Sequence, residues 1–198
     1  LDKTGVTEDY IHISDGVKIA MALEAQGIDF IDVSVGLYET GMTCVEPVSF
    51  PQGWRHDLIK AVKDHVKMPV IGVSVIREPA VAEKFLDDGV EDFISMGRSW
   101  LADEQWGKKV QEGRESELCK CISCLRCFES LNEYNAAGIP AECALNPRLA
   151  REKKYGELPY DTKHHSVVVV GGGPSGMMAA KTLAERGCKV TLLDRGST

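Results

Sequence analysis

The sequence predicts an α/β protein in three parts, and three patterns lead to this prediction. Amphipathic stretches alternate with short, β-branched apolar runs through residues 1–112, as expected for helices and strands of a parallel sheet. A cysteine-rich segment with a linker follows over 113–165, and its spacing is that of a metal or cluster site. Residues 166–198 then read as strand, glycine turn, helix and strand, the start of a Rossmann-like dinucleotide-binding domain.

The composition narrows the class of protein. The chain has 198 residues, 43% of them hydrophobic, and a net charge of -7 with no basic block, which argues against a nucleic-acid partner. No apolar run approaches the roughly 20 residues of a membrane span, and no signal peptide is visible. Together with clustered cysteines, this predicts a cytoplasmic protein with a small-molecule substrate, while a homo-oligomer stays open.

The two chain ends suggest a piece of a longer protein. The sequence starts at Leu1 within a polar stretch and stops at Thr198, just after the second strand of a βαβ unit. We therefore expect that other parts of the protein lie outside this sequence.

The first part repeats helix and strand three times and closes on a helix. The expected strands cover residues 28–35, 68–75 and 92–96, and the expected helices cover about 14–26, 54–66, 79–86 and 99–111. Near-continuous apolar strands predict a parallel sheet with both faces covered, either open or closed into a barrel. In both architectures ligands bind at the carboxyl ends of the strands.

Two of the loops at those strand ends suit a phosphate group. The chain turns into a helix near Pro79 after the second strand, and Gly97-Arg98 opens a helix after the third. Backbone amides at a helix start, together with an arginine, are suited to phosphate binding. Gly-Arg alone is a weak signal, and a surface arginine is the competing interpretation.

The cysteine-rich segment carries the C-x2-C-x2-C pattern. Cys121, Cys124 and Cys127 form it, and Cys143 follows after a loop. A short turn can direct three thiolates at one point while a remote fourth cysteine completes an iron–sulfur site. Structural zinc is the main alternative, and a disulfide framework is a minor one. Cys119 lies just outside the pattern, and an exchange with Cys121 stays open.

The last part contains Gly-x-Gly-x-x-Gly at the junction of a strand and a helix. The first glycine permits a tight turn, the second lets the backbone approach a pyrophosphate, and the third allows close helix packing. An acidic residue at the end of the next strand is placed to bond a ribose hydroxyl. The predicted dinucleotide-binding residues are Gly171, Gly173, Pro174, Ser175, Gly176 and Asp194. The pattern itself does not separate FAD from NAD.

Taken in order, these parts resemble a known family. The stretch VIGVSVIREPAVAEKFLDDGVEDFISMGRSWLADEQWGKKVQEG, followed by CISCLRC and CALNPR, is similar to old yellow enzyme-type NADH:flavin oxidoreductases. The similarity is to their longer members, the group of 2,4-dienoyl-CoA reductase, enoate reductase and trimethylamine dehydrogenase. It implies that residues 1–112 are the C-terminal part of an FMN-binding TIM (β/α)8 barrel.

The resemblance also implies the cofactors and their residues. The backbone around Ser74 and Val75, with Gly97 and Arg98, would hold the FMN phosphate, and the four cysteines a 4Fe-4S cluster. FAD is implied at the glycine turn, with NAD(P)H as electron donor. The chain departs from the family at Ser74-Val75, which leaves backbone donation but removes one side-chain contact.

A second departure concerns the catalytic residue. Dienoyl-CoA reductases place a histidine near the position of Tyr38, which here either donates a proton or only lines the pocket. The expected reaction is reduction of an activated C=C, with electrons passing from FAD through the cluster to FMN. The alternatives are amine oxidation in the reverse direction, an electron-input module like the small subunit of glutamate synthase, and a zinc-stapled domain without enzymatic activity.

Overall fold

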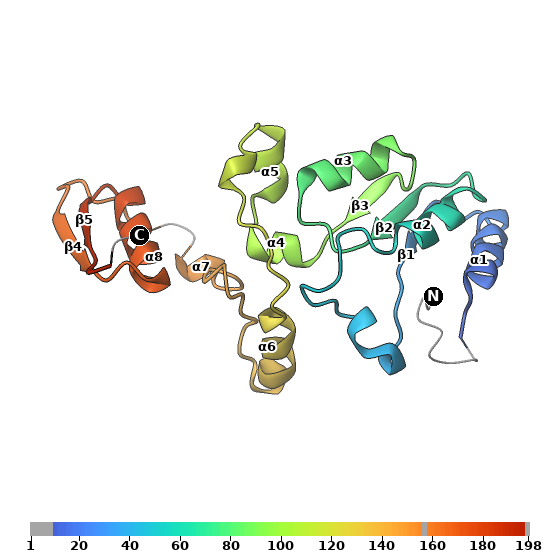
Figure 1. The fold of residues 1–198 in the computed structure, drawn as a ribbon, viewed down its shortest axis with the longest axis horizontal. Coiled ribbons are helices and arrows are strands. Elements are labelled where there is room, and N and C mark those ends of the chain that lie inside the picture. Colours follow the sequence, from blue (N-terminus) through green and yellow to red (C-terminus); the bar gives the residue numbers. More distant parts are fainter. Residues whose placement is uncertain (1–9, 156–157, 197–198) are drawn as a thin grey trace. The chain divides into compact units, whose positions relative to one another are not determined.

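The computed structural model describes residues 10–155 and 158–196 (Figure 1). The chain forms two compact units, with the division between Ala150 and Arg151. Both units combine helices with parallel strands, so the fold is mixed α/β, as predicted. Residues 113–150 of the cysteine-rich segment belong to the first unit, and the rest of its linker, residues 151–165, belongs to the second.

The first unit is built on a three-stranded parallel sheet. Its strands are β1 (Ile31–Val33), β2 (Val70–Val73) and β3 (Phe93–Ser95), in the order β1-β2-β3. The register pairs Ile31 with Val70 and Ile71 with Phe93. Each strand lies inside its predicted run but is shorter, because the flanking apolar residues enter loops instead of extending the ladder.

Three helices precede or connect these strands, close to the predicted ranges. They are α1 (Ile13–Ala25), α2 (His56–Lys63) and α3 (Pro79–Asp87), which begins with proline at its first position. The buried core lies between α1, α2 and one face of the sheet. It consists of Ala20, Val33, Ile59, Val62, Val66, Met68, Val70 and Val90.

The opposite face of the sheet is largely open among the described residues. Alternate residues of a strand point to opposite faces, so Asp32, Ile71 and Phe93, which the register places side by side, share this face. Phe93 is 58% exposed. Phe93 borders a cavity together with residues of α3 and of α5 (Trp106–Gln111), whereas the core-side face of the sheet is covered by α1 and α2.

The helix predicted over 99–111 is broken into two. Helix α4 spans Arg98–Ala102 and α5 spans Trp106–Gln111, with an extended Asp103 between them. The buried Asp103 carboxylate accepts hydrogen bonds from the Gln105 amide (3.0 Å) and the Lys109 ammonium (2.6 Å). Aspartate competes in this way with helical hydrogen bonding, so the helix stops there.

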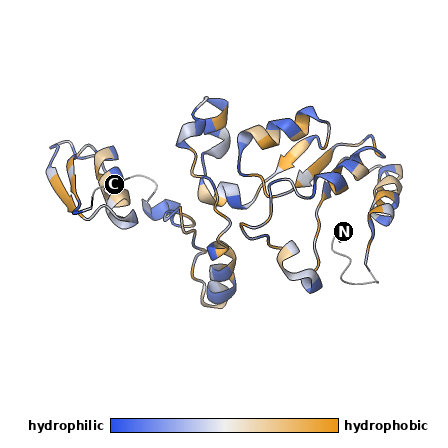
Figure 2. Cartoon of the chain, in the orientation of Figure 1, coloured by the Kyte–Doolittle hydropathy of each residue, from blue (hydrophilic) through white to orange (hydrophobic). Residues whose placement is uncertain are grey.

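The remaining elements are short in the cysteine-rich segment and regular in the second unit. A 3-10 turn η1 (Tyr38–Thr43) follows β1, and η2 (Glu115–Glu117), α6 (Arg126–Tyr134) and η3 (Asn135–Ala137) lie in the cysteine-rich segment. The second unit contains α7 (Glu152–Tyr155), β4 (Ser166–Val170), α8 (Pro174–Glu185) and β5 (Lys189–Leu193). Strands β4 and β5 are parallel, form a βαβ unit with α8, and are strongly hydrophobic (Figure 2).

Among the described residues, no helix is both long and apolar enough to cross a membrane.

Candidate functional site

Two neighbouring cavities in the first unit contain most of the site residues that were predicted within that unit. The first, called the anion pocket here, has a volume of about 200 Å³ and is lined by residues from the ends of β2 and β3. The second, called the cysteine cavity, is lined by the four predicted ligand cysteines. Three residues line both of them, namely Arg98, Cys121 and Ser123.

The structure brings three of the four predicted phosphate residues to the anion pocket. Val75, Gly97 and Arg98 line it, whereas Ser74 does not. The Ser74 side chain is only 1% exposed, and its hydroxyl accepts a hydrogen bond from the Arg55 amide at 2.9 Å. Its side chain therefore stabilises the loop before α2 and is not directed at a ligand.

Val75 has a left-handed backbone conformation, with φ at 52°. This region is unfavourable for a β-branched residue, because its side chain crowds the backbone. The turn ends β2 and directs the following residues along the pocket. Strain of this kind is found at binding sites, which agrees with the position of Val75 in the pocket wall.

A buried carboxylate that the sequence did not reveal organises the pocket. Glu46 is 3% exposed, and its carboxylate forms ion pairs with Arg55 and with Arg98 (2.8 Å). It also accepts a hydrogen bond from the Trp54 indole at 3.0 Å. Burial lowers the pKa of the Arg55 guanidinium, and the charge of Glu46 opposes that effect. Glu46 thus sets the orientation of Arg98.

The cysteine cavity collects Cys121, Cys124, Cys127 and Cys143 from two separate stretches of chain. Ser123 and Leu125, which lie between the ligand positions, have positive φ angles of 50° and 63°. Such alternation turns successive amides toward one side and forms concavities that bind anions. The Ser123 amide donates to the Cys121 sulfur at 3.4 Å, as expected for amides that serve sulfur ligands.

The four predicted ligand cysteines line one cavity but do not form a single-ion site as they stand. Within residues 10–155 and 158–196, no three Cys, His, Asp or Glu side chains are grouped closely enough to hold a single metal ion. Burial also raises the pKa of the Cys127 thiol, so a bound metal has to displace that proton.

Cys119 has a different role from Cys121. It does not line the cysteine cavity, and its backbone amide donates to the Asp103 carboxylate at 2.9 Å. This geometry favours Cys121 as the ligand and makes Cys119 part of an anchor at the start of the segment.

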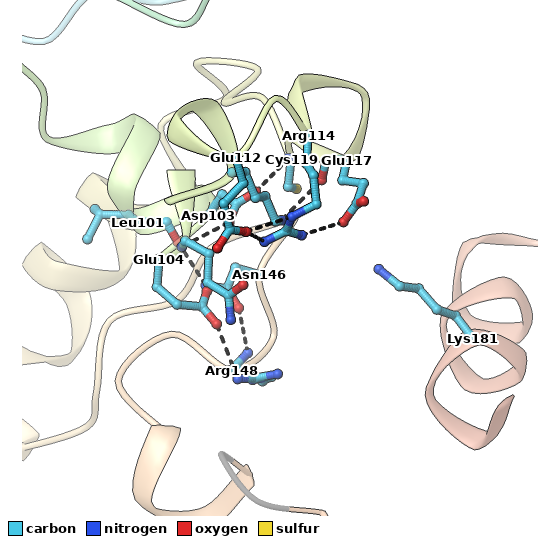
Figure 3. Close-up of polar contacts among 12 residues, drawn as sticks. Leu101, Asp103, Glu104, Glu112, Arg114, Glu117, Cys119, Asn146, Arg148 and Lys181 are labelled. Atoms are coloured by element: carbon cyan, nitrogen blue, oxygen red, sulfur yellow. Dashed lines mark hydrogen bonds and ion pairs between the residues drawn. The ribbon is translucent and has the colours of Figure 1, made fainter. Parts of the chain in front are cut away.

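A second anchor holds the end of the segment to the same helix break (Figure 3). The Asn146 amide group, 8% exposed, donates to the Leu101 carbonyl at 3.0 Å and to the Glu104 carboxylate at 3.3 Å. Arg148 forms an ion pair with Glu104 at 3.1 Å. The Asn-Pro-Arg element after Cys143 therefore fixes the chain next to this predicted ligand through contacts with the end of α4.

Helix α6 fixes Cys143 from the other side. The buried Ser130 hydroxyl donates to the Cys127 carbonyl (3.0 Å) and accepts from the Glu142 amide (2.9 Å). The Glu142 carboxylate accepts from Arg126 at 2.7 Å. Cys127 and Cys143, two predicted ligands that are remote in sequence, are thus connected through one serine.

Tyr38, the predicted catalytic residue, lies apart from the anion pocket. It begins η1, is 97% exposed and is not among the residues that line either cavity. Its catalytic role stays a prediction.

The second unit brings the predicted dinucleotide-binding residues together. Gly171 has a φ of 106°, Gly173 caps α8, and Pro174 is its first residue, followed by Ser175 and Gly176. The Asp194 carboxylate accepts from the amides of Gly172 (2.5 Å) and Gly196 (2.7 Å). These backbone bonds lower its pKa, so Asp194 stays ionised beside the turn.

Substituting Gly176 with alanine is expected to destabilise the second unit by several kcal/mol, because overpacking against rigid backbone cannot relax. A Cβ at this position would lie 1.8 Å from the Gly171 carbonyl oxygen. Gly173→Ala is the matched control, since a Cβ there meets nothing within 4 Å. Thermal unfolding followed by circular dichroism compares them, and equal melting temperatures would contradict the close-packing role of Gly176.

Comparison with known proteins identifies the class. Residues 2–117 match the NADH:flavin oxidoreductase / NADH oxidase family, and residues 164–198 match an FAD binding domain family. The chain therefore belongs to the NADH:flavin oxidoreductase / NADH oxidase family, as the resemblance of its motifs indicated.

Individual relatives extend the match over nearly the whole chain. The NADH oxidase of Thermoanaerobacter brockii is 44% identical over 184 residues, which are 92% of this chain and 28% of the relative. The cinnamate reductase of Clostridium sporogenes is 32% identical over 92% of this chain and 27% of its own length. A solved complex of 2-naphthoyl-CoA reductase with 2-naphthoyl-CoA matches with a TM-score of 0.83 at 30% identity, covering 93% of this chain and 28% of that one. The chain spans little more than a quarter of these relatives.

Proposed function

We propose that this chain is part of an NAD(P)H-dependent flavoenzyme that reduces an activated C=C bond, such as that of an enoate or an enoyl thioester. Its first unit would belong to an FMN-binding TIM barrel with a 4Fe-4S site, and its second would begin a Rossmann-like FAD domain. One observation carries the proposal, namely that four cysteines line a cavity that shares Arg98, Cys121 and Ser123 with the anion pocket.

Within that scheme, the residues of this chain would bind the cofactors and hold them in position. Arg98, held by Glu46, supplies positive charge to the anion pocket, where the FMN phosphate would lie. Cys121, Cys124, Cys127 and Cys143 would ligate the cluster, and the Ser123 amide would stabilise thiolate charge. Bound flavins and a cluster allow an electron pair from a nicotinamide to be divided, passed on singly and recombined.

The names of two relatives support this substrate class. Cinnamate is an enoate, and 2-naphthoyl-CoA is an unsaturated acyl thioester. Both have a C=C bond conjugated with a carbonyl group, which accepts hydride from reduced flavin.

The decisive experiment is metal analysis of this chain purified without oxygen. We expect about four irons and four acid-labile sulfides per chain, with an EPR signal after reduction. Cys124→Ser and Cys143→Ser should each remove most of the iron, whereas Cys188→Ser, in the second unit, should remove none. Zinc without sulfide would contradict the electron relay.

Assays with the full-length enzyme separate the two directions of electron flow. NAD(P)H oxidation that depends on an added enoate supports the proposal. Turnover of amines only, with electrons leaving through the cluster, would contradict the substrate assignment while leaving the cofactors unchanged.

A further inference from the structure

The anion pocket contains more positive charge than its single carboxylate balances. Among its lining residues, the charged side chains are those of Glu46, Arg55, Arg77 and Arg98. Glu46 is bound by Arg55 and by Arg98. Three guanidinium groups and one carboxylate leave the pocket with a formal charge of two positive units, which is the complement of a phosphomonoester dianion.

Arg77 is the arginine without a counter-charge. Among the described residues no carboxylate lies within ion-pair distance of it, and its Nη2 donates only to the Phe50 carbonyl at 3.2 Å. Its Nε is buried and has no acceptor there. A guanidinium kept partly desolvated without an acid is costly unless an anion completes its hydrogen bonds.

The backbone around Arg77 is held firmly in place. The Gln52 side-chain oxygen accepts from the amides of Arg77 (2.6 Å) and Glu78 (2.8 Å). The Ser99 hydroxyl donates to the Ile76 carbonyl at 2.5 Å, which ties the loop after β2 to α4. The loops that carry Arg77 and Arg98 are therefore fixed to each other.

Arg77 also differs from Arg98 in which cavity it serves. Arg98 lines both cavities, whereas Arg77 lines the anion pocket and not the cysteine cavity. The charge of Arg77 is thus available to a ligand of the pocket and not to the thiolates.

We propose that Arg77 is a phosphate-binding residue of the anion pocket, and that Arg77 and Arg98 together select a terminal phosphomonoester. Arg77 provides the side-chain contact that Val75, with its apolar side chain, cannot make. This inference rests on the proposed function, because the phosphomonoester concerned is that of FMN. It distinguishes FMN from riboflavin, which has no phosphate, and from FAD, whose two phosphates are joined as a pyrophosphate with one charge each and no terminal phosphomonoester.

The test compares Arg77→Gln with Lys84→Gln in the full-length protein. Lys84 lies on the neighbouring α3, and its side chain is 68% exposed, so its substitution removes a charge without touching the pocket. Isothermal titration measures the binding of FMN, riboflavin and inorganic phosphate. We expect Arg77→Gln to weaken the binding of FMN and of phosphate by about 10- to 100-fold, as loss of a charge-assisted hydrogen bond does. The affinity for riboflavin should stay the same. Lys84→Gln should change none of the three.

The outcomes separate this inference from the proposed function. If the unsubstituted full-length protein binds FMN tightly and Arg77→Gln binds FMN and phosphate equally well, the role of Arg77 is overturned while the FMN site stands. If the unsubstituted full-length protein binds neither FMN nor phosphate, the FMN site itself is overturned. If Arg77→Gln fails to fold, Arg77→Lys decides, since it keeps the charge but loses the planar fork and should show an intermediate loss.

Discussion

Replacing Glu46 with alanine is expected to lower the free energy of unfolding by about 3–5 kcal/mol, as loss of one partner from a buried ion pair does. The side chains of Glu46 and Arg55 are 4% and 5% exposed, so the loss of the carboxylate would leave the Arg55 guanidinium largely buried without its ion-pair partner. Arg55 would keep its hydrogen bonds to the carbonyls of Thr43 (2.6 Å) and Val73 (3.2 Å). Its buried charge, however, would have no opposite charge beside it.

Urea denaturation measures this effect, with Asp88→Ala as the control. Asp88 pairs with Lys84 at 2.6 Å, but both side chains are about half exposed or more, so this pair should contribute less than about 1 kcal/mol. Glu46→Gln should lie between the two, because it keeps the shape and loses the charge. A cost for Glu46→Ala no larger than that of Asp88→Ala would show that Glu46 does not organise the pocket.

A second large effect concerns Glu91 and pH. Glu91 is 3% exposed, its Oε2 has no hydrogen-bond partner among the described residues, and it lies against Gly72. A Cβ at Gly72 would come within 1.5 Å of that oxygen, so the strand makes room for the carboxyl group by lacking a side chain. Burial, with a smaller contribution from the charge of Asp32, raises the pKa of Glu91 from 4.5 to about 7.

The sign of the pH effect follows from this raised pKa. Between pH 4.5 and about 7 the folded chain keeps the proton of Glu91 while the unfolded chain loses it, so stability falls as pH rises. At about 1.4 kcal/mol for each unit of pKa difference, the loss across this range is roughly 3 kcal/mol. Asp92 and Asp103 have lowered pKa values, and their stabilisation is lost toward acidic pH instead.

The variant Glu91→Gln isolates the contribution of this one group. Its side chain is neutral throughout, so it should match the parent near pH 4.5 and exceed it in stability near pH 8. Urea midpoints of both chains at the two pH values provide the comparison, with the exposed Glu83→Gln as control. If the urea midpoints of Glu91→Gln and the parent differ by the same amount at both pH values, Glu91 is not protonated in the folded chain.

Local sequence patterns predicted the order of the helices and strands. They also predicted the turn that carries Cys121, Cys124 and Cys127 and the glycine turn that starts at Gly171. Helices α1, α2 and α3 begin and end within a few residues of their expected bounds, because caps, glycines and Pro79 are local signals. The cysteine cavity and the turn at Gly171 could be predicted because their residues are close in sequence, apart from Cys143 and Asp194.

The features that sequence did not predict depend on contacts between distant residues. Glu46 meets Arg98 across 52 positions, and Asn146 meets Leu101 across 45. The orientation of the Ser74 side chain depends on its hydrogen bond with the Arg55 amide. The break in the expected helix over 99–111 depends on hydrogen bonds that involve Lys109 and Cys119. In each case a polar side chain found a partner that no local pattern identifies.

The helix break at residues 103–105 has a consequence for how a cluster is acquired. Both ends of the segment that carries the cysteines are bound there, through the Cys119 amide on Asp103 and through Asn146 on Leu101 and Glu104. The intervening chain is a closed loop whose two ends are bound to this break while the thiols are free. If the proposed cluster binds there, iron and sulfide would enter a loop whose ends are already fixed.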